Sequence, residues 1–87
     1  GWSAWVIPGE VTLRARAPGD RLHPLGGSGH RLVVRELQDR KVPRSHRAGW
    51  PVLVRGGELL WVPGVCRGAV AVPDGGSDAV RVDVTHA

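Results

Sequence analysis

Two short apolar runs on either side of a glycine pair place the strongest limit on how this chain can fold. Val52-Leu53-Val54-Arg55 is separated from Glu58-Leu59-Leu60-Trp61-Val62 by Gly56-Gly57 alone. Glycine readily adopts the positive φ angles that a tight two-residue hairpin turn needs at both of its positions. The sequence therefore predicts a β-hairpin with a primed turn, and with it an antiparallel sheet.

Further strands are expected on both sides of this hairpin. Residues 11–16 alternate between two kinds of side chain, which predicts a strand. Its inward face would carry Val11, Leu13 and Ala15. Its outward face would carry Thr12, Arg14 and Arg16, and would therefore be cationic. Residues 69–72 and 79–84 are two more strand candidates, and a loop at residues 73–77 separates them. Near the start of the chain, an apolar segment ends at a Pro8-Gly9 turn. Its large side chains would pack in the core or at a sheet edge: Trp2, Trp5, Val6 and Ile7.

Between these strands the sequence favours two helices. Residues 32–42 form the first, because Val33 and Leu37 recur at helical spacing while Glu36 and Arg40 can pair on the opposite side. A short second helix over residues 44–48 would follow Pro43, with Gly49 ending it. With 87 residues, the whole chain is expected to form one small domain. Its fold class would be α+β: a sandwich-like, mainly antiparallel sheet with both helices packed against it.

The positive charge is concentrated in one part of the chain. The net charge is +4, yet residues 14–47 hold nine Lys and Arg against three acidic residues, a local charge of +6. The remainder has three basic and five acidic residues, a charge of −2. Such a basic patch is typical of a surface that binds nucleic acid. A solvated surface without a partner is the alternative interpretation.

The stretch RAPGDRLHPLGGSGHR, residues 16–31, raises the question of a phosphate-binding loop. A nucleotide-binding loop would need a lysine and a hydroxyl residue after its glycines, where this chain has His30-Arg31. A weaker role is to hold one phosphate of a nucleic-acid backbone, through the glycine N–H groups beside Arg31. Pro18-Gly19-Asp20 is expected to be a turn, with Asp20 capping or pairing locally, and residues 24–29 to brace the entry into the helix.

No catalytic or metal site emerges from the remaining residues. The histidines and Cys66 lack metal-ligand spacing, and Cys66 is better explained as a buried small side chain at a strand end. Adjacent Ser45 and His46 do not make a nucleophile and base. The tryptophans could stack on bases, but Trp50 and Trp61 are interpreted as core residues. The single cysteine favours a cytoplasmic setting, because domains of this size from oxidising compartments usually carry several cysteines. No stretch of the sequence predicts a membrane span. The start without methionine suggests a piece of a longer protein.

Four blocks of sequence between Arg14 and Gly64 make a specific pattern. They are Arg14-x-Arg16-x-Pro18-Gly19-Asp20-Arg21; Pro24-Leu25-Gly26-Gly27; Asp39-Arg40-Lys41-Val42-Pro43-Arg44; and Pro51-Val52-Leu53-Val54 with Gly57-Glu58-Leu59-Leu60-Trp61-Val62-Pro63-Gly64. Their order and spacing closely resemble the C-terminal substrate-binding domain of tRNA(Ile)-lysidine synthetase. A related fold occurs in the phenylalanyl-tRNA synthetase β subunit, which implies a β-rich sandwich with packed helices. The chain departs from the family pattern at the helix start, where Arg31 replaces a lysine-rich run, and at Glu36.

The resemblance implies that residues 1–87 are a single accessory domain of a larger enzyme, without the catalytic domain. Members of the family use ATP to adenylate the wobble cytidine of tRNA(Ile) and then attach lysine. The catalytic domain that does this carries a Ser-Gly-Gly-x-Asp-Ser loop absent from this chain. This domain would then bind no cofactor, while ATP and Mg²⁺ would serve the parent enzyme. Its partners would be tRNA(Ile), contacted at the acceptor stem, and the catalytic domain. A protein-interaction or dimerisation module, with the basic face against the catalytic domain or a second copy, is the alternative.

Seven basic residues are the candidate tRNA contacts. Helical RNA is recognised through its shape, phosphates and 2′-hydroxyls, a task that suits arginines held on rigid strands and loops. The candidates are Arg14, Arg16, Arg21, Arg31, Arg40, Lys41 and Arg44. No residue is expected to be catalytic or to bind a metal.

Overall fold

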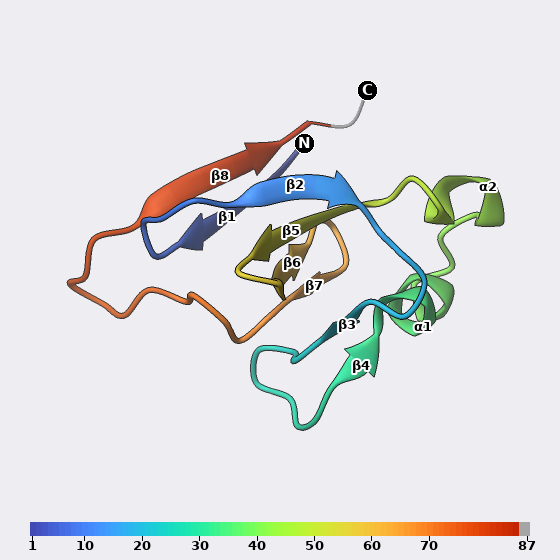
Figure 1. Cartoon of the computed structure of the whole chain (residues 1–87), viewed down its shortest axis with the longest axis horizontal. Helices are drawn as coiled ribbons and strands as arrows, with labels where there is room; N and C mark the ends of the chain where they lie inside the picture. Colours follow the sequence, from blue (N-terminus) through green and yellow to red (C-terminus); the bar gives the residue numbers. More distant parts are fainter. Residues whose placement is uncertain (86–87) are drawn as a thin grey trace.

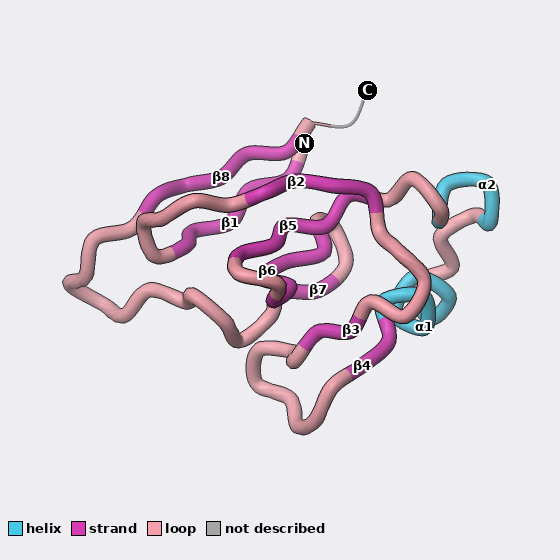
Figure 2. Tube along the Cα trace, in the orientation of Figure 1, coloured by secondary structure: helices cyan, strands magenta, loops and turns pink. Residues whose placement is uncertain are grey.

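Three small antiparallel sheets and two short helices make up the fold. The structure, a computed structural model, describes residues 1–85. The elements are β1 (Trp2–Val6), β2 (Thr12–Ala15), β3 (Arg21–Leu22), β4 (Arg31–Leu32), α1 (Val33–Asp39), α2 (Arg44–Arg47), β5 (Pro51–Arg55), β6 (Glu58–Val62), β7 (Cys66–Arg67) and β8 (Val80–Val84). Figures 1 and 2 show the two helices together at one end of the molecule. The expected α+β fold with mainly antiparallel strands is confirmed.

The central sheet, in the order β2-β5-β6-β7, is covered on both faces. On one face, Val52, Leu59 and Val62 pack with Leu22 of β3 and Leu37 of α1. On the other face, side chains of β5 and β6 pack against the β1–β8 sheet; this second core comprises Val6, Leu53, Leu60, Trp61 and Val84. Burial on both faces explains why β5 and β6 are continuous apolar runs and not alternating ones.

The predicted hairpin forms as expected, with one irregularity. Gly56 and Gly57 have φ angles of 57° and 82°, the positive pair of a primed turn. Across the two strands Leu53 pairs with Trp61 and Val54 with Leu59, so Leu60 is an extra residue in β6. This bulge lets the consecutive residues Leu60 and Trp61 both enter the core beneath β1 and β8.

The prediction of a strand over residues 69–72 is wrong. After β7 the chain turns, and Ala71 has a φ of 57°. The guanidinium of Arg67 explains this course, because it donates to the carbonyl oxygens of Gly68, Val70 and Ala71. It also donates to the carbonyls of Leu60 and Trp5. In an extended strand, successive carbonyl groups point to opposite sides. Such a strand could not direct the adjacent carbonyls of Val70 and Ala71 to the same guanidinium. The later strand, predicted over 79–84, is confirmed as β8.

The faces predicted for residues 11–16 are only partly correct: Val11 packs against the second core and Thr12 is exposed, as expected, but the other positions differ. Leu13, expected inside, is 51% exposed, whereas Arg14 and Arg16, expected outside, are partly buried. Both arginines are drawn inward by polar partners described below. Hydrogen bonds to a carboxylate and to a backbone carbonyl thus accompany the inward placement of the two arginines. Near the N-terminus, Val6 is buried, but Trp5 and Ile7 are 57% and 43% exposed.

The helices are shorter than the sequence predicts. Leu32 belongs to β4, so α1 begins at Val33, and it ends at Asp39. The N–H groups of Lys41 and Val42 donate to the carbonyls of Gln38 and Leu37, and Lys41 has a φ of 58°. This left-handed residue ends the helix, as glycine commonly does. The second helix, α2, closely matches its prediction. Within residues 1–85, no helix is long and apolar enough to span a membrane.

The loop at residues 16–31 is a hairpin built on β3 and β4. Arg21 pairs with Leu32, and Leu22 with Arg31. Pro24 bridges to Gly68, and the N–H of Leu25 donates to the carbonyl of Arg67. The stretch therefore braces α1 against the central sheet, as the sequence suggested.

Candidate nucleic-acid interface

The basic residues divide into those bound within the chain and those that face solvent freely. Arg14 belongs to the first group, since its two terminal nitrogens lie 2.8 and 3.0 Å from the two carboxylate oxygens of Asp20. Asp20 also accepts the N–H of Ala17 at 2.7 Å, which closes the Pro18-Gly19 turn. The hydrogen bond from Arg14 holds the pKa of Asp20 below its usual value. The expected local pairing of Asp20 is confirmed.

Two further arginines near the helices also bind backbone carbonyls. Arg16 donates through Nε to the carbonyl of Arg47 at 2.7 Å, and Arg47 donates through Nε to the carbonyl of Val42 at 2.8 Å. Together they link β2 to α2 and to the turn after α1. Arg55 has a similar role at the other end of the sheet, where it donates to the carbonyls of Ile7, Gly9 and Glu10. These arginines thus stabilise the fold through hydrogen bonds to backbone carbonyls.

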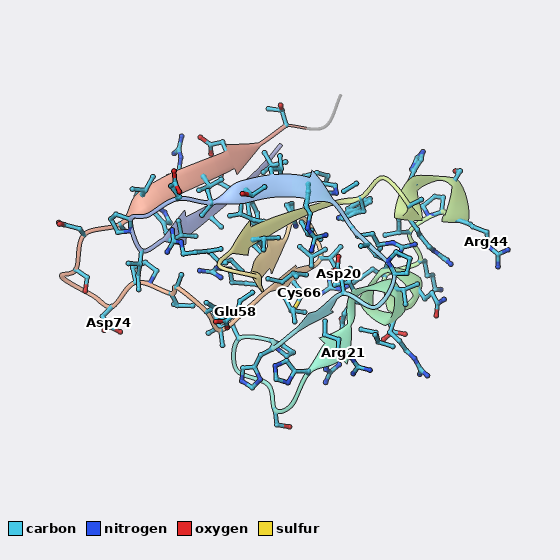
Figure 3. All side chains as sticks on the ribbon, in the orientation of Figure 1. Asp20, Arg21, Arg44, Glu58, Cys66 and Asp74 are labelled. Carbon is cyan, nitrogen blue, oxygen red and sulfur yellow. The ribbon has the colours of Figure 1, made fainter. Side chains whose placement is uncertain are left out.

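A second set of cations is exposed and free. Among residues 1–85, no hydrogen-bond or ion-pair partner is found for these side chains, which are Arg21, Arg35, Arg40, Lys41 and Arg44. Figure 3 shows Arg21 at the β3–β4 hairpin and Arg44 at α2, with α1 between them in this view. The exposed cations therefore follow α1 and the turns at both of its ends.

One hollow, here called the α1 hollow, collects three arginines. Its volume is about 360 Å³, and Arg21, Arg31 and Arg35 line it together with Glu36 and Asp39. Arg31 contacts Glu36 through one 3.4 Å ion pair and keeps 57% of its side chain exposed. This pair replaces the expected pairing of Glu36 with Arg40. Glu36 and Asp39 together balance two of the three arginine charges, so the lining of the hollow keeps a net positive charge.

A second hollow lies at the turn between α1 and α2 and is called the tryptophan hollow. Its volume is about 520 Å³, and it is lined by Trp2, Trp50, Arg40, Lys41 and His46, with Val42 and Pro43. The expectation that Trp50 is simply a core residue is only partly correct, because Trp50 packs on the core with one side and lines this hollow with the other. Trp61 is buried, as predicted.

Two N–H groups at the glycine stretch and at the start of α1 are already bonded within the chain. Gly27 donates its N–H to the carbonyl of Pro24, and Val33, the first residue of α1, donates to the carbonyl of Asp20. The weaker phosphate-holding role suggested for this loop therefore loses two of its donors. Arg31 keeps its place at the α1 hollow.

Catalytic and metal chemistry find little support in the described part of the chain. Within residues 1–85, no group of three or more His, Cys, Asp or Glu side chains could hold a metal ion. Cys66 is half-buried in β7, and this burial raises the pKa of its thiol above the usual value. A raised pKa keeps the thiol protonated and disfavours nucleophilic attack.

Known proteins are similar to this chain in sequence and in fold. Residues 11–84 match the family model described as the TilS substrate C-terminal domain. The chain belongs to this family. A tRNA(Ile)-lysidine synthase from Symbiobacterium thermophilum is 48% identical over 79 residues, which is 90% of this chain and 16% of that protein. The tRNA(Ile)-lysidine synthase of Geobacter sulfurreducens is 46% identical over 88% of this chain and 16% of its own length. A crystal structure of a TILS C-terminal domain matches with a TM-score of 0.80 and 26% identity, over 92% of this chain and 65% of that one.

The TilS family match extends beyond the blocks that the sequence suggested. It continues past Gly64 to residue 84 and so includes β7 and β8, whereas β1 with Trp2 lies outside it. The chain spans about one sixth of the length of the two synthases, since it covers 16% of each.

Two features of the hollows were absent from the predicted site. Arg35 lines the α1 hollow beside Arg31. The two arginines are four residues apart, and this helical spacing was the signal in the sequence that could have placed them on one face. Trp2 and Trp50 lie 48 positions apart, and no local pattern indicates that their rings meet.

Proposed function

We propose that this chain is the accessory tRNA-binding domain of a larger tRNA(Ile)-lysidine ligase. It would grip tRNA(Ile), at the acceptor stem, while the catalytic domain attaches lysine to the wobble cytidine with ATP. The family membership and the names of the related synthases support this assignment. The relatives are much longer than this chain, which leaves ample length for a catalytic domain.

The α1 hollow is the observation that carries the proposal. Arg21, Arg31 and Arg35 come from β3, β4 and α1, and neighbouring residues of β3 and α1 pack in one core, so the backbone positions of these arginines are set before RNA arrives. Helical RNA exposes phosphates and 2′-hydroxyls across a shallow groove, and guanidinium groups bind phosphate with paired hydrogen bonds. Three arginines around a shallow hollow fit such a backbone without reading its sequence.

The remaining candidates take two different roles in this proposal. Arg40, Lys41 and Arg44 extend the cationic surface past the end of α1 and supply further phosphate contacts. Arg14 and Arg16 are already engaged with Asp20 and the carbonyl of Arg47. We therefore assign them mainly to positioning, because they hold β2 and the helical end of the domain together.

ATP and Mg²⁺ belong with the remainder of the enzyme in this proposal. The glycine loop lacks the lysine and hydroxyl residues of a nucleotide-binding loop, and the N–H of Gly27 is used inside the chain. The residues of this chain thus do not fit ATP or Mg²⁺, and we assign no chemical step to this chain.

Titration of the 87-residue chain with tRNA(Ile) at several salt concentrations tests the proposal. We expect Arg35→Ala to weaken binding and to lower the slope of log K against log salt by up to about one unit. The matched control is Arg81→Ala, which removes an exposed arginine of β8 whose charge is paired locally with Asp83. Equal effects of the two substitutions on affinity and slope would show that net charge, and not the α1 hollow, governs binding.

The alternative of a protein-interaction module is separated by a second titration. Large apolar side chains are exposed on several segments, among them Trp5 at 57% and Leu13 at 51%. Binding to the rest of the enzyme or self-association, together with no affinity for tRNA, would favour this alternative. Sedimentation of the chain alone and with tRNA distinguishes the outcomes.

A further inference from the structure

We propose that the tryptophan hollow binds one unpaired nucleotide of the RNA, with its base against an indole ring and its phosphate beside Arg40 and Lys41. This inference rests on the proposed tRNA-binding function and deepens it. The α1 hollow accounts for contacts to a paired RNA backbone. The α1 hollow gives no role to Trp2 and Trp50, which line the tryptophan hollow beyond the end of α1.

The indole rings form a fixed wall of the hollow. The centroids of Trp2 and Trp50 lie 5.6 Å apart, and the ring planes meet at 44°. Trp2 lies over Gly64, where an added Cβ would come within 2.6 Å of its Nε1 atom. Trp50 donates its own Nε1–H to the carbonyl of Pro63 at 3.0 Å. Both rings are therefore anchored on the same turn after β6, and a base stacking on them would not have to order them first.

Charge selects the kind of occupant. Arg40, Lys41 and His46 surround the indoles, and no acidic residue lines this hollow within the described chain. A flat aromatic ring that carries an adjacent negative charge suits such a site, and a nucleotide combines both. A proline-rich peptide could also pack on tryptophans, but it would have no use for three basic side chains.

The backbone places Lys41 at the hollow despite an unfavourable conformation. Lys41 has a φ of 58°, a value that glycine adopts at lower cost. Its N–H donates to Gln38, and the following residue, Val42, is buried in the core. The helix end is thus pinned on both sides of Lys41, and the side chain is held out into solvent next to Arg40. The conformation that ends α1 therefore also fixes where the Lys41 side chain leaves the backbone.

The two hollows lie at neighbouring positions along the chain. Asp39 lines the α1 hollow, and Arg40 lines the tryptophan hollow. One RNA that occupies both would pass from paired to unpaired nucleotides at the end of α1. Bases inside a duplex are stacked on one another and cannot offer a face to an indole. In a tRNA such a change occurs where the acceptor stem meets the unpaired 3′ end.

The test compares two RNA probes on the 87-residue chain. One is a blunt RNA duplex, and the other is the same duplex with a short unpaired 3′ overhang. Fluorescence anisotropy of labelled RNA measures both affinities. We expect the overhang to strengthen binding between about fivefold and a hundredfold, the range for stacking one base on an aromatic side chain.

Matched variants identify the hollow as the source of this gain. Trp2→Leu should abolish the overhang advantage, and Trp2→Phe should retain most of it because an aromatic face remains. Trp5→Leu is the control, because it removes a 57% exposed tryptophan from the same strand but outside the hollow. It should leave the advantage unchanged.

Lys41→Gly keeps the proposal testable if the tryptophan variants unfold. Glycine accepts the φ of Lys41, so thermal unfolding should be unchanged or shifted upward, while the overhang advantage should fall. Equal affinity for blunt and overhang RNA, with normal salt dependence, would overturn this inference and leave the tRNA-binding function intact. Failure to bind either probe would overturn both. Displacement of the overhang by a proline-rich peptide, with no contribution from Lys41, would identify a protein-binding hollow instead.

Discussion

At the scale of single residues, the fate of each arginine depends on its nearest acceptor. Arg14 lies six positions from Asp20 and forms a two-point ion pair with it. Arg21 and Arg35 meet no acceptor among residues 1–85 and remain available for phosphates. The same side chain thus stabilises the fold in one place and offers a binding group in another.

Asp20 makes part of the stability dependent on acid. Its pKa is lowered in the folded state, so its contribution is present above the unfolded value of about 4 and is lost as the pH falls through the folded value. We expect Asp20→Asn to destabilise the domain by about 1 kcal/mol at neutral pH, since Arg14 is partly exposed. The difference in unfolding free energy from the wild type should shrink below about pH 4. Urea unfolding at pH 3 and pH 7 measures it, and a constant difference would contradict this role.

At the scale of elements, the passage out of β7 depends on a close backbone approach. Gly68 donates its N–H to the carbonyl of Leu60 at 2.7 Å, and that carbonyl also accepts from Arg67. The extra residue of the β6 bulge is therefore bonded by the segment that follows β7. Burial lowers the pKa of Arg67, but its carbonyl partners keep the charged group in place.

Gly68→Ala should disrupt this approach. An added Cβ would lie 2.9 Å from the carbonyl oxygens of Leu59 and Leu60, which are backbone atoms that cannot turn aside. We expect the free energy of unfolding to fall by about 1–3 kcal/mol, as for overpacking elsewhere. Gly75→Ala is the control, because nothing lies within 4 Å of its added Cβ, and it should stay within about 0.5 kcal/mol of the wild type. Similar values for both variants would show that the segment moves easily.

At the scale of the whole molecule, one sheet joins two cores. Leu37 of α1 is buried on one side of the β5–β6 hairpin, and Leu60 is buried on the other. Neither core has a sheet of its own that could stand without β5 and β6. The binding surface at α1 and the β1–β8 layer should therefore unfold together.

Leu37→Ala and Leu60→Ala test this coupling. Each should cost about 2–5 kcal/mol, the usual range for removing a fully buried leucine. Far-UV circular dichroism and tryptophan fluorescence should report one shared transition for each variant. Separate transitions by the two probes, above all for Leu60→Ala, would mean that the α1 side folds independently of the β1 side.

Local patterns in the sequence determined much of this protein. The hairpin at Gly56-Gly57, the turn at Asp20 and the short helix after Pro43 follow from residues next to one another, because turn and helix signals act over a few positions. The family resemblance followed from motifs in the same stretches. The failed predictions, at residues 69–72 and on the faces of β2, concern segments whose course depends on the guanidiniums of Arg67 and Arg14.

Only the tertiary structure decided which cations are free and where the hollows lie. Arg16 meets the carbonyl of Arg47 across 31 positions, and Trp2 meets Trp50 across 48. The sequence placed a positive charge of +6 in one segment but could not separate arginines that hold the fold from those that can hold RNA. That distinction depends on which carbonyls and carboxylates folding brings within hydrogen-bond distance, and some of those partners, such as the carbonyl of Arg47 for Arg16, are remote in the chain.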